Sequence, residues 1–267
     1  MSASNSATIE RRHHDDWAKN IADEEIHYKE FFEASTAPEN RYILSQIGDL
    51  NDKQMLDLGT GPGEASLYFR EKKACVTSFD LSIEMLKYAQ NQAQKRSLQL
   101  ALVGGDAAQL PFGSNVFDIV YGANILHHVP YRLVISEVQR VLKPGGKAYF
   151  IEPLIYNPAI KIYRKMAKQF QSPDEKAFRF SELKYFEEYF SEVRYQEFWL
   201  TTLWIFIHFF LIDRVMPSKE RYWKKIVKEH KRLEKMYYWL EGIDKKILKR
   251  FPILRYFCWN VVVTARK

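Results

Sequence analysis

The sequence predicts an α/β protein built on a doubly wound parallel sheet, and three observations support this prediction. Short apolar runs alternate with helix-forming stretches between residues 52 and 151. The connections between them are short turns. A glycine-rich segment, Leu56 to Glu64, joins the first apolar run directly to a helix-forming stretch. Alternation of strand and helix with short turns is typical of sheets that carry helices on both faces.

Each expected element follows from its pattern of apolar and polar residues. A first strand reaches Asp57, and further buried strands are expected at Ala74 to Phe79, Leu98 to Val103, Val116 to Tyr121 and Lys147 to Ile151. Helices are expected at Ala65 to Lys72, Ser82 to Arg96, Arg132 to Leu142 and Ser181 to Ser191, with Ser82 as an N-cap. A sixth strand is expected at Val193 to Leu200.

The glycine-rich turn favours a bound ligand. Gly59, Gly61 and Gly63 lack a Cβ, so the main chain can bend tightly and approach a ligand closely. Asp57 places a carboxylate at the carboxyl end of a strand, where open α/β sheets bind ligands. By itself the G-x-G-x-G pattern also fits an ordinary strand-to-helix turn.

Polar residues follow the next strands as well. Asp80 comes after the second strand, where a carboxylate can accept hydrogen bonds from both hydroxyls of a ribose. Asp106 follows the third strand, although a role in a turn or as a helix cap also explains it. Asn124 follows the fourth strand. Together with the glycine turn, these positions predict a nucleoside-bearing cofactor.

Five segments resemble, in order, the motifs of class I S-adenosylmethionine-dependent methyltransferases: L-D-L-G-T-G-P-G-E, S-F-D-L-S, G-D-A-A-Q-L-P-F, F-D-I-V-Y-G-A-N-I-L-H-H-V and L-K-P-G-G-K-A-Y-F-I-E-P. The resemblance covers residues 50 to 153. A dehydrogenase usually spaces its glycines G-x-G-x-x-G, and Glu64 stands where that third glycine would be. The resemblance implies a Rossmann-like sheet of seven strands whose last strand, Trp259 to Ala265, is antiparallel. It also implies S-adenosyl-L-methionine as the cofactor and S-adenosyl-L-homocysteine as its product.

Roles for individual residues follow from this resemblance. The methionine part of the cofactor would be bound by Asp57, Gly59, Thr60, Gly61 and Gly63, and its ribose by Asp80. The adenine would be surrounded by Leu81, Met85, Asp106 and Ala107, and Asn124 would lie near the sulfonium. His127 and His128 are the catalytic candidates, because an imidazole is a suitable base for a hydroxyl acceptor. His128 is preferred, since related enzymes often carry a histidine there. Histidines held by local backbone bonds would explain the pair equally well.

The chain divides into a helical leader at residues 1–51, a core at 52–199 with a lid at 154–180, a helical insertion at 200–256 and the final strand at 257–267. In similar enzymes such a leader packs over the cofactor. The pair His13 and His14 within it is interpreted as a solvated stretch. The expected acceptor contacts are Tyr28, Tyr156, Tyr163, Arg179 and His208.

The insertion is unusual in its composition. It opens with Phe198 to Ile212, fifteen mostly apolar residues, which is fewer than the roughly 20 needed to span a bilayer. From Leu200 onward there are 16 Lys and Arg against 6 Asp and Glu, a net charge of +10. The chain before Leu200 has 24 Lys and Arg against 27 Asp and Glu, a net charge of −3. Three interpretations stay open: an anionic membrane surface, nucleic-acid phosphates, or a helical cap with a solvated lysine face.

Composition agrees with a cytoplasmic enzyme, with or without peripheral contact to a membrane. The 267 residues can hold one sizeable core. Cys75 and Cys258 are expected to be reduced core residues, no secretory signal is recognised, and no metal site is expected because no Cys/His cluster has ligand spacing. We therefore expect a methyltransferase that acts, at oxygen, on a small or lipid-like hydrophobic acceptor. An RNA methyltransferase and a non-catalytic cofactor-binding regulatory protein are the alternatives, and the oligomeric state is not predicted.

Overall fold

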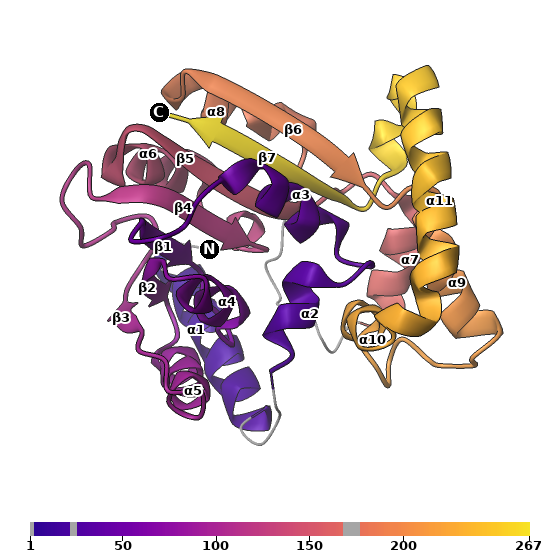
Figure 1. Ribbon diagram of the computed structural model, residues 1–267, viewed down its shortest axis with the longest axis horizontal. Helices are drawn as coiled ribbons and strands as arrows, with labels where there is room; N and C mark the ends of the chain where they lie inside the picture. Colours follow the sequence, from indigo (N-terminus) through magenta and orange to yellow (C-terminus); the bar gives the residue numbers. More distant parts are fainter. Residues whose placement is uncertain (1–2, 22–25, 168–176) are drawn as a thin grey trace.

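Seven strands form one mixed sheet in the order β3-β2-β1-β4-β5-β7-β6. The structure is a computed structural model that describes residues 3–21, 26–167 and 177–267 (Figure 1). The strands are β1 (Gln54–Leu58), β2 (Cys75–Asp80), β3 (Ala101–Gly104), β4 (Phe117–Ala123), β5 (Leu142–Pro153), β6 (Glu192–Phe198) and β7 (Asn260–Arg266). Strands β1 to β5 pair in parallel, and β7 is antiparallel to both β5 and β6. The predicted doubly wound sheet and its antiparallel last strand are confirmed.

Helices cover both faces of this sheet. The leader forms α1 (Ala3–Asn20), α2 (Tyr28–Glu33) and α3 (Pro38–Ile47), and the core adds α4 (Glu64–Glu71), α5 (Ile83–Gln94), α6 (Tyr131–Val141), α7 (Pro158–Met166) and α8 (Leu183–Tyr189). Elements α1 to α5 pack in one apolar cluster with one face of the sheet, and α6 and α8 pack in a second cluster with the other. The central strands are buried on both faces, which explains why they read as continuous apolar runs.

Several element boundaries differ from those expected, and positive φ angles explain two of them. Ser97 has a φ of 55° in the turn after α5, where the amide of Leu98 still donates to the Ala93 carbonyl at 3.0 Å, and β3 begins at Ala101 rather than at Leu98. Trp199 has a φ of 69°, which is incompatible with an extended strand, and β6 therefore stops at Phe198. Cys258 is buried as expected, but Cys75 is exposed at the start of β2, so its assignment to the core was wrong.

The insertion between β6 and β7 is helical, with its own apolar core. It comprises α9 (Trp204–Leu211), α10 (Tyr222–Lys228) and α11 (His230–Arg250), with 3-10 turns at Thr201–Leu203 and Pro252–Phe257. Its core gathers Trp199, Phe206, Phe209, Tyr222 and Tyr237. Figure 1 shows α11 standing at the edge of the molecule, next to the ends of β6 and β7.

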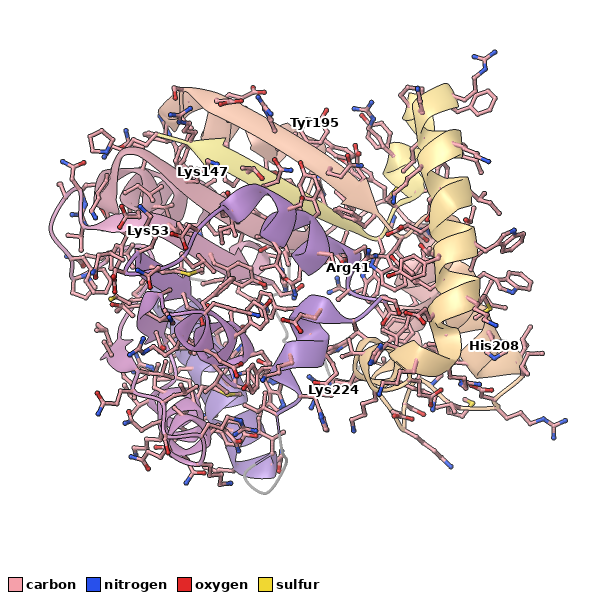
Figure 2. The ribbon with its side chains drawn as sticks, viewed as in Figure 1. Arg41, Lys53, Lys147, Tyr195, His208 and Lys224 are labelled. Carbon is pink, nitrogen blue, oxygen red and sulfur yellow. The ribbon has the colours of Figure 1, made fainter. Side chains whose placement is uncertain are left out.

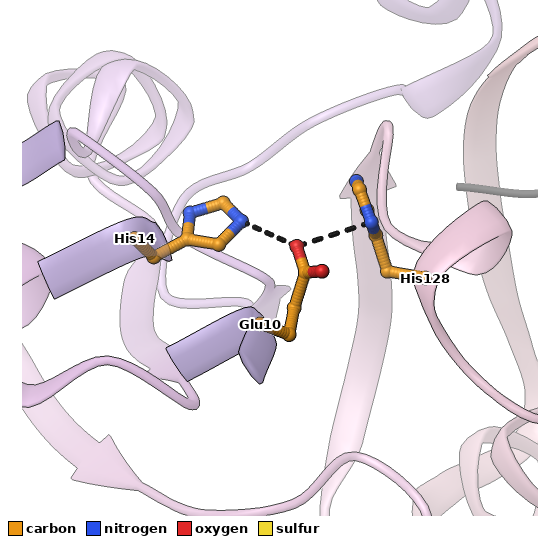
Figure 3. A group of neighbouring side chains, drawn as sticks. All are labelled: Glu10, His14 and His128. Carbon is orange, nitrogen blue, oxygen red and sulfur yellow. Dashed lines mark hydrogen bonds and ion pairs between the residues drawn. The ribbon is translucent and has the colours of Figure 1, made fainter. Parts of the chain in front are cut away.

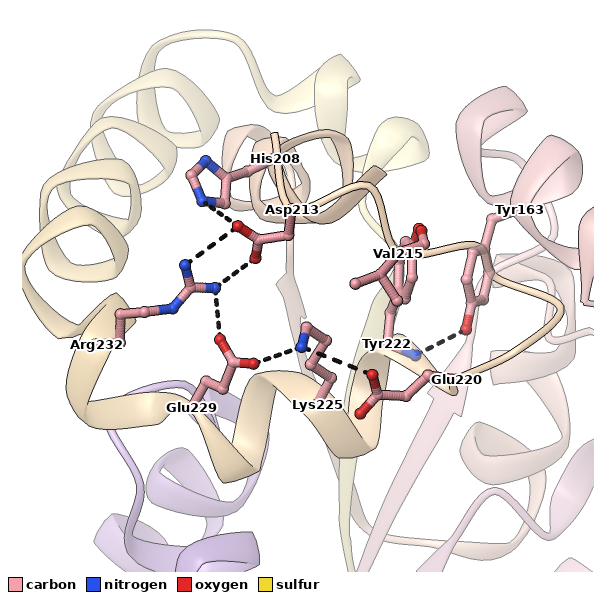
Figure 4. A network of polar contacts seen from close by, with 9 residues as sticks. All are labelled: Tyr163, His208, Asp213, Val215, Glu220, Tyr222, Lys225, Glu229 and Arg232. Atoms are coloured by element: carbon pink, nitrogen blue, oxygen red, sulfur yellow. Dashed lines mark hydrogen bonds and ion pairs between the residues drawn. The ribbon is translucent and has the colours of Figure 1, made fainter. Parts of the chain in front are cut away.

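Charged side chains hold the three insertion helices together (Figure 4). Arg232 at the start of α11 contacts Asp213, after α9, at 2.6 Å and Glu229 at 2.5 Å. Lys225 of α10 contacts the same Glu229 at 2.5 Å. Since each carboxylate joins two elements, this network fixes the connection from α9 through α10 to α11.

The leader attaches the insertion to the core. Arg41 of α3 donates to Glu241 of α11 at 2.7 Å, and Figure 2 shows Arg41 between these two helices. Thr36 donates its hydroxyl to the Ile226 carbonyl at 2.9 Å. The leader, the insertion and the sheet therefore meet at one place.

Candidate functional site

The glycine turn after β1 wraps around the end of β2. The amides of Gly59 and Thr60 both donate to the Phe79 carbonyl, at 2.8 and 3.0 Å. The amide of Gly61 donates to the Asp80 carboxylate at 2.8 Å. A Cβ on Gly59, which has a φ of +73°, would lie 2.7 Å from the side chain of Ile125. Only glycine fits this close approach between the turn and Ile125.

Two carboxylates lie at this edge of the sheet. Asp57 is buried and accepts a hydrogen bond from the Ser66 hydroxyl at 2.5 Å, and burial raises the pKa of Asp57 to about 7. Asp80 accepts amides from Gly61 and Ser82, each at 2.8 Å, yet burial still raises its pKa above the ordinary value. Buried acids of this kind are electrostatically suited to a cationic ligand.

Glu152, at the end of β5, shapes the segment that carries both histidines. It is fully buried and accepts the amides of Ile125 and Leu126 at 3.0 and 2.7 Å. Its second oxygen lies 2.6 Å from Nδ1 of His127. The sequence contained Glu152 in a recognised motif but did not reveal this role, because β5 reaches the segment only through its pairing with β4.

The leader helix α1 reaches the same place (Figure 3). One oxygen of Glu10 lies 2.9 Å from Nε2 of His14 and 3.1 Å from Nδ1 of His128. Although burial alone would lower the pKa of His14, the carboxylates of Glu10, Asp80 and Asp15 raise it above the ordinary value. The interpretation of His14 as part of a solvated stretch was wrong, since tertiary packing brings it against the core.

These groups surround a cavity of about 1170 Å³ that reaches from the glycine turn to the insertion. Single-ligand pockets usually measure roughly 300–1,000 Å³, so the space suits a cofactor together with an acceptor. The sequence-predicted residues that line it are Asp57, Gly59, Thr60, Gly61, Asp80, Leu81, Asp106, Ala107, Asn124, His127, His128 and Tyr163.

Two predicted cofactor residues do not line this cavity. Gly63 begins α4 with a φ of +97°, and a Cβ there would meet the Ala89 Cβ at 2.8 Å, so its role in this structure is helix packing. Met85 is fully buried within α5 and does not reach the cavity wall. Asp106 does line the cavity, but its side chain also accepts the Ala108 amide at 2.8 Å in a turn.

Four of the five predicted acceptor contacts lie elsewhere. Tyr28 donates to Glu71 at 3.1 Å, and Tyr156 stacks on Phe180. Arg179 is exposed, and part of the expected lid, residues 168–176, lies outside the described residues. His208 pairs with Asp213 at 3.5 Å, and Figure 2 shows it on the outer side of the insertion. Of this set the structure brings only Tyr163 to the cavity wall.

Apart from Tyr163, the far end of the cavity is formed by residues that sequence analysis did not assign to the site. The buried Glu39, at the start of α3, accepts hydrogen bonds from the Trp199 indole at 2.7 Å and from Asn260 at 2.6 Å. Aromatic and aliphatic side chains complete the wall: Phe31, Ile160, Tyr163, Trp199, Trp223, Ile226, Val227 and Trp259. These residues come from the leader, α7, the insertion and the positions next to the ends of β6 and β7, so no local pattern could have grouped them.

The group Glu10, His14 and His128 also has the spacing of metal ligands. Their donor atoms all lie within 4.8 Å of one another. The sequence predicted no metal site, because these residues become neighbours only when α1 packs on the core. Among the described helices, none is both long and apolar enough to cross a membrane.

Comparison with known proteins identifies the core. Residues 56–150 match the family described as a methyltransferase domain. This segment is similar to S-adenosylmethionine-dependent methyltransferases. The assignment agrees with the predicted cofactor, and both rest on the motifs that surround the cavity.

Two curated relatives illustrate the range of reactions in this family. The chain is 36% identical over 115 residues to the ubiquinone/menaquinone biosynthesis C-methyltransferase of Desulfotalea psychrophila, covering 42% of this chain and 46% of the relative. It is 33% identical over 111 residues to the ubiquinone biosynthesis O-methyltransferase of Coxiella burnetii, covering 41% and 47%. The chain thus spans about half the length of the relatives it matches.

The fold as a whole also has known counterparts. The crystal structure of the cyclase SpnF matches with a TM-score of 0.56 and 18% identity, covering 87% of this chain and 80% of that one. At this identity the likeness shows the fold alone. Because that protein is named a cyclase, the fold by itself does not identify the reaction.

Proposed function

We propose that this protein transfers a methyl group from S-adenosylmethionine to a small, largely apolar acceptor. The observation that carries the proposal is one cavity that joins the methyltransferase motifs to an aromatic wall made by the insertion. Asp57, the glycine turn and Asp80 fit the cofactor, since they offer carboxylates to its ammonium and ribose and a main chain without Cβ obstruction. When bound, the cofactor supplies an electrophilic methyl group.

The proposed acceptor atom is oxygen, with His128 as the base. His128 lines the cavity beside Asn124, at the carboxyl edge of β4. The imidazole would take the proton of an acceptor hydroxyl, which makes the oxygen nucleophilic. The two relatives are named for carbon and for oxygen methylation, so support for oxygen comes from this histidine.

We further propose that the acceptor is lipid-like and that the insertion contacts an anionic membrane. Of the 17 large hydrophobic side chains exposed among the described residues, 12 lie between Trp204 and Phe257. Exposed lysines of α11, such as Lys235 and Lys245, lie on the same helix as the exposed Trp239. This combination is typical of interfacial helices, whereas phosphate binding alone would not require so many apolar groups.

Methyl transfer from labelled S-adenosylmethionine to hydroxylated quinones with long and short prenyl tails tests the function. We expect transfer to a hydroxyl oxygen, faster for the longer tail, and a much lower rate for His128→Ala with unchanged affinity for S-adenosylhomocysteine. Product analysis by mass spectrometry distinguishes O-methyl from C-methyl products. Cofactor binding without transfer to any acceptor in this class would contradict the proposal and support a non-catalytic role.

A further inference from the structure

The carboxylate of Glu10 occupies an unusual position between two imidazoles. Glu10 and His14 are four residues apart in α1, which places both side chains on one face of the helix. His128 comes from the turn after β4, 118 residues away in sequence from Glu10. All three side chains are largely shielded from solvent, with exposed fractions of 12%, 24% and 15% for Glu10, His14 and His128.

This contact determines which nitrogen of His128 can act as a base. A carboxylate only accepts hydrogen bonds, so Nδ1 of His128 must carry the proton that points to Glu10. In the neutral ring the lone pair then resides on Nε2. When Nε2 takes a proton, the ring becomes a cation 3.1 Å from the carboxylate, which stabilises it.

Two contacts made by residues that follow Glu10 along α1 hold this helix in place. The Ser82 hydroxyl, at the start of α5, donates to Asp15 at 2.5 Å. The guanidinium of Arg221, from the insertion, lies 4.7 Å from the centre of the Trp17 ring. One contact is with α5, beside the glycine turn, and the other is with the insertion, so α1 is attached to both parts while Glu10 contacts His128.

We propose that Glu10 is a positioning residue for His128, supplied by the leader helix, and that His14 orients its carboxylate. The inference rests on the proposed function of His128 and deepens it. During transfer the acceptor oxygen forms a bond to the methyl carbon, and the electron pair of the broken carbon–sulfur bond stays with sulfur. The proton of the acceptor hydroxyl moves to Nε2 of His128. Glu10 keeps its charge throughout, and His128 later releases the proton to water.

The neighbouring histidine has a different role. Nδ1 of His127 faces Glu152, but that carboxylate also accepts two backbone amides and is fully buried. We therefore assign the pair of His127 and Glu152 to shaping the turn. The titratable groups near His128 include Glu10, His13 and His14 from α1 and His127 from its own turn. Glu152 lies behind His127, and Arg221 is near His13.

The test compares Glu10→Gln with Asp16→Asn, an equivalent acid-to-amide change at an exposed position of the same helix. In Glu10→Gln we expect kcat to fall by about 10- to 100-fold with KM values nearly unchanged, because the base is weakened and not removed. The acidic limb of the kcat/KM profile should move to lower pH, and Glu10→Asp should recover part of the rate. Asp16→Asn should behave like the wild type.

Nuclear magnetic resonance of ¹⁵N-histidine provides a readout that does not depend on turnover. The titration midpoint of His128 should fall by about one pH unit or more in Glu10→Gln, as expected when a nearby carboxylate is neutralised. If no acceptor is methylated, this measurement still decides the role of Glu10 while the proposed function fails separately. An unchanged midpoint and kcat would overturn the inference. So would wild-type activity that a chelator abolishes and Zn²⁺ restores, since the three residues would then bind a metal.

Discussion

At the scale of single residues, Asp57 couples cofactor binding to pH. Burial raises the pKa of Asp57 to about 7 in the ligand-free protein. A cationic ammonium beside it would favour the ionised carboxylate, so binding at lower pH must first remove a proton. We expect the affinity for S-adenosylhomocysteine to fall by up to about tenfold per pH unit below about 7. Calorimetric titrations between pH 5 and 8 test this, and an equally steep dependence in Asp57→Asn would assign it to another group.

The same carboxyl group should make the stability of the protein depend on pH in the opposite direction. Its folded-state pKa lies above the unfolded value, so its stabilising contribution is complete below about pH 4 and is lost as pH rises from there through about 7. The wild type should therefore lose up to roughly 4 kcal/mol of unfolding free energy relative to Asp57→Asn between pH 4 and 8. Chemical denaturation of both ligand-free proteins measures the difference. A difference in unfolding free energy that stays constant between pH 4 and 8 would contradict the prediction.

Residues whose environment is set by local sequence could be predicted. Asp57, Gly59 and Asp80 belong to strand-to-helix turns, where chain direction places the side chain or amide at the sheet edge. Glu10 and Glu39 could not be found in this way, because each has a partner in a segment more than 100 residues distant. Sequence patterns show periodicity within an element, whereas these contacts depend on how separate elements pack.

At the scale of elements, one buried carboxylate of α11 organises the start of α9. Asp244 accepts the amides of Leu200, Thr201 and Thr202 and both threonine hydroxyls, at 2.5 to 3.3 Å. It thereby caps the 3-10 turn that leads into α9. The sequence predicted an insertion here, but a capping group that comes from another helix has no local signal.

Replacing Asp244 by Asn should therefore loosen the insertion. The asparagine side chain has no negative charge and only one acceptor oxygen, so it cannot replace all the hydrogen bonds that the carboxylate accepts. Hydrogen bonds to charged groups contribute about 1.5–3 kcal/mol each. We expect a loss of roughly 2–3 kcal/mol in unfolding free energy, together with faster hydrogen exchange at residues 200–211. Glu234→Gln, at an exposed site of the same helix, should change neither. Unaltered exchange in Asp244→Asn would show that the cap does not hold α9.

At the scale of the whole molecule, charge and apolar surface are segregated together. The part of the chain after Leu200 carries a net charge of +10, and it also presents exposed Leu211 and Trp239. Its buried residues form a core that continues into the cavity wall through Trp199. A membrane bound at this surface would thus lie next to the element that shapes the acceptor site.

Vesicle flotation tests whether this surface binds lipid. We expect the protein to bind vesicles that contain anionic lipid, less tightly as salt increases, because basic residues and apolar groups both contribute. The double change of Leu211 and Trp239 to Ser should weaken partitioning by at least about tenfold, since each large apolar group removed from water contributes roughly 1.5–3 kcal/mol. Val116→Ser, an exposed apolar site of the core, is the matched control. Retention on RNA that persists in the double variant, without vesicle binding by the wild type, would favour a nucleic-acid substrate instead.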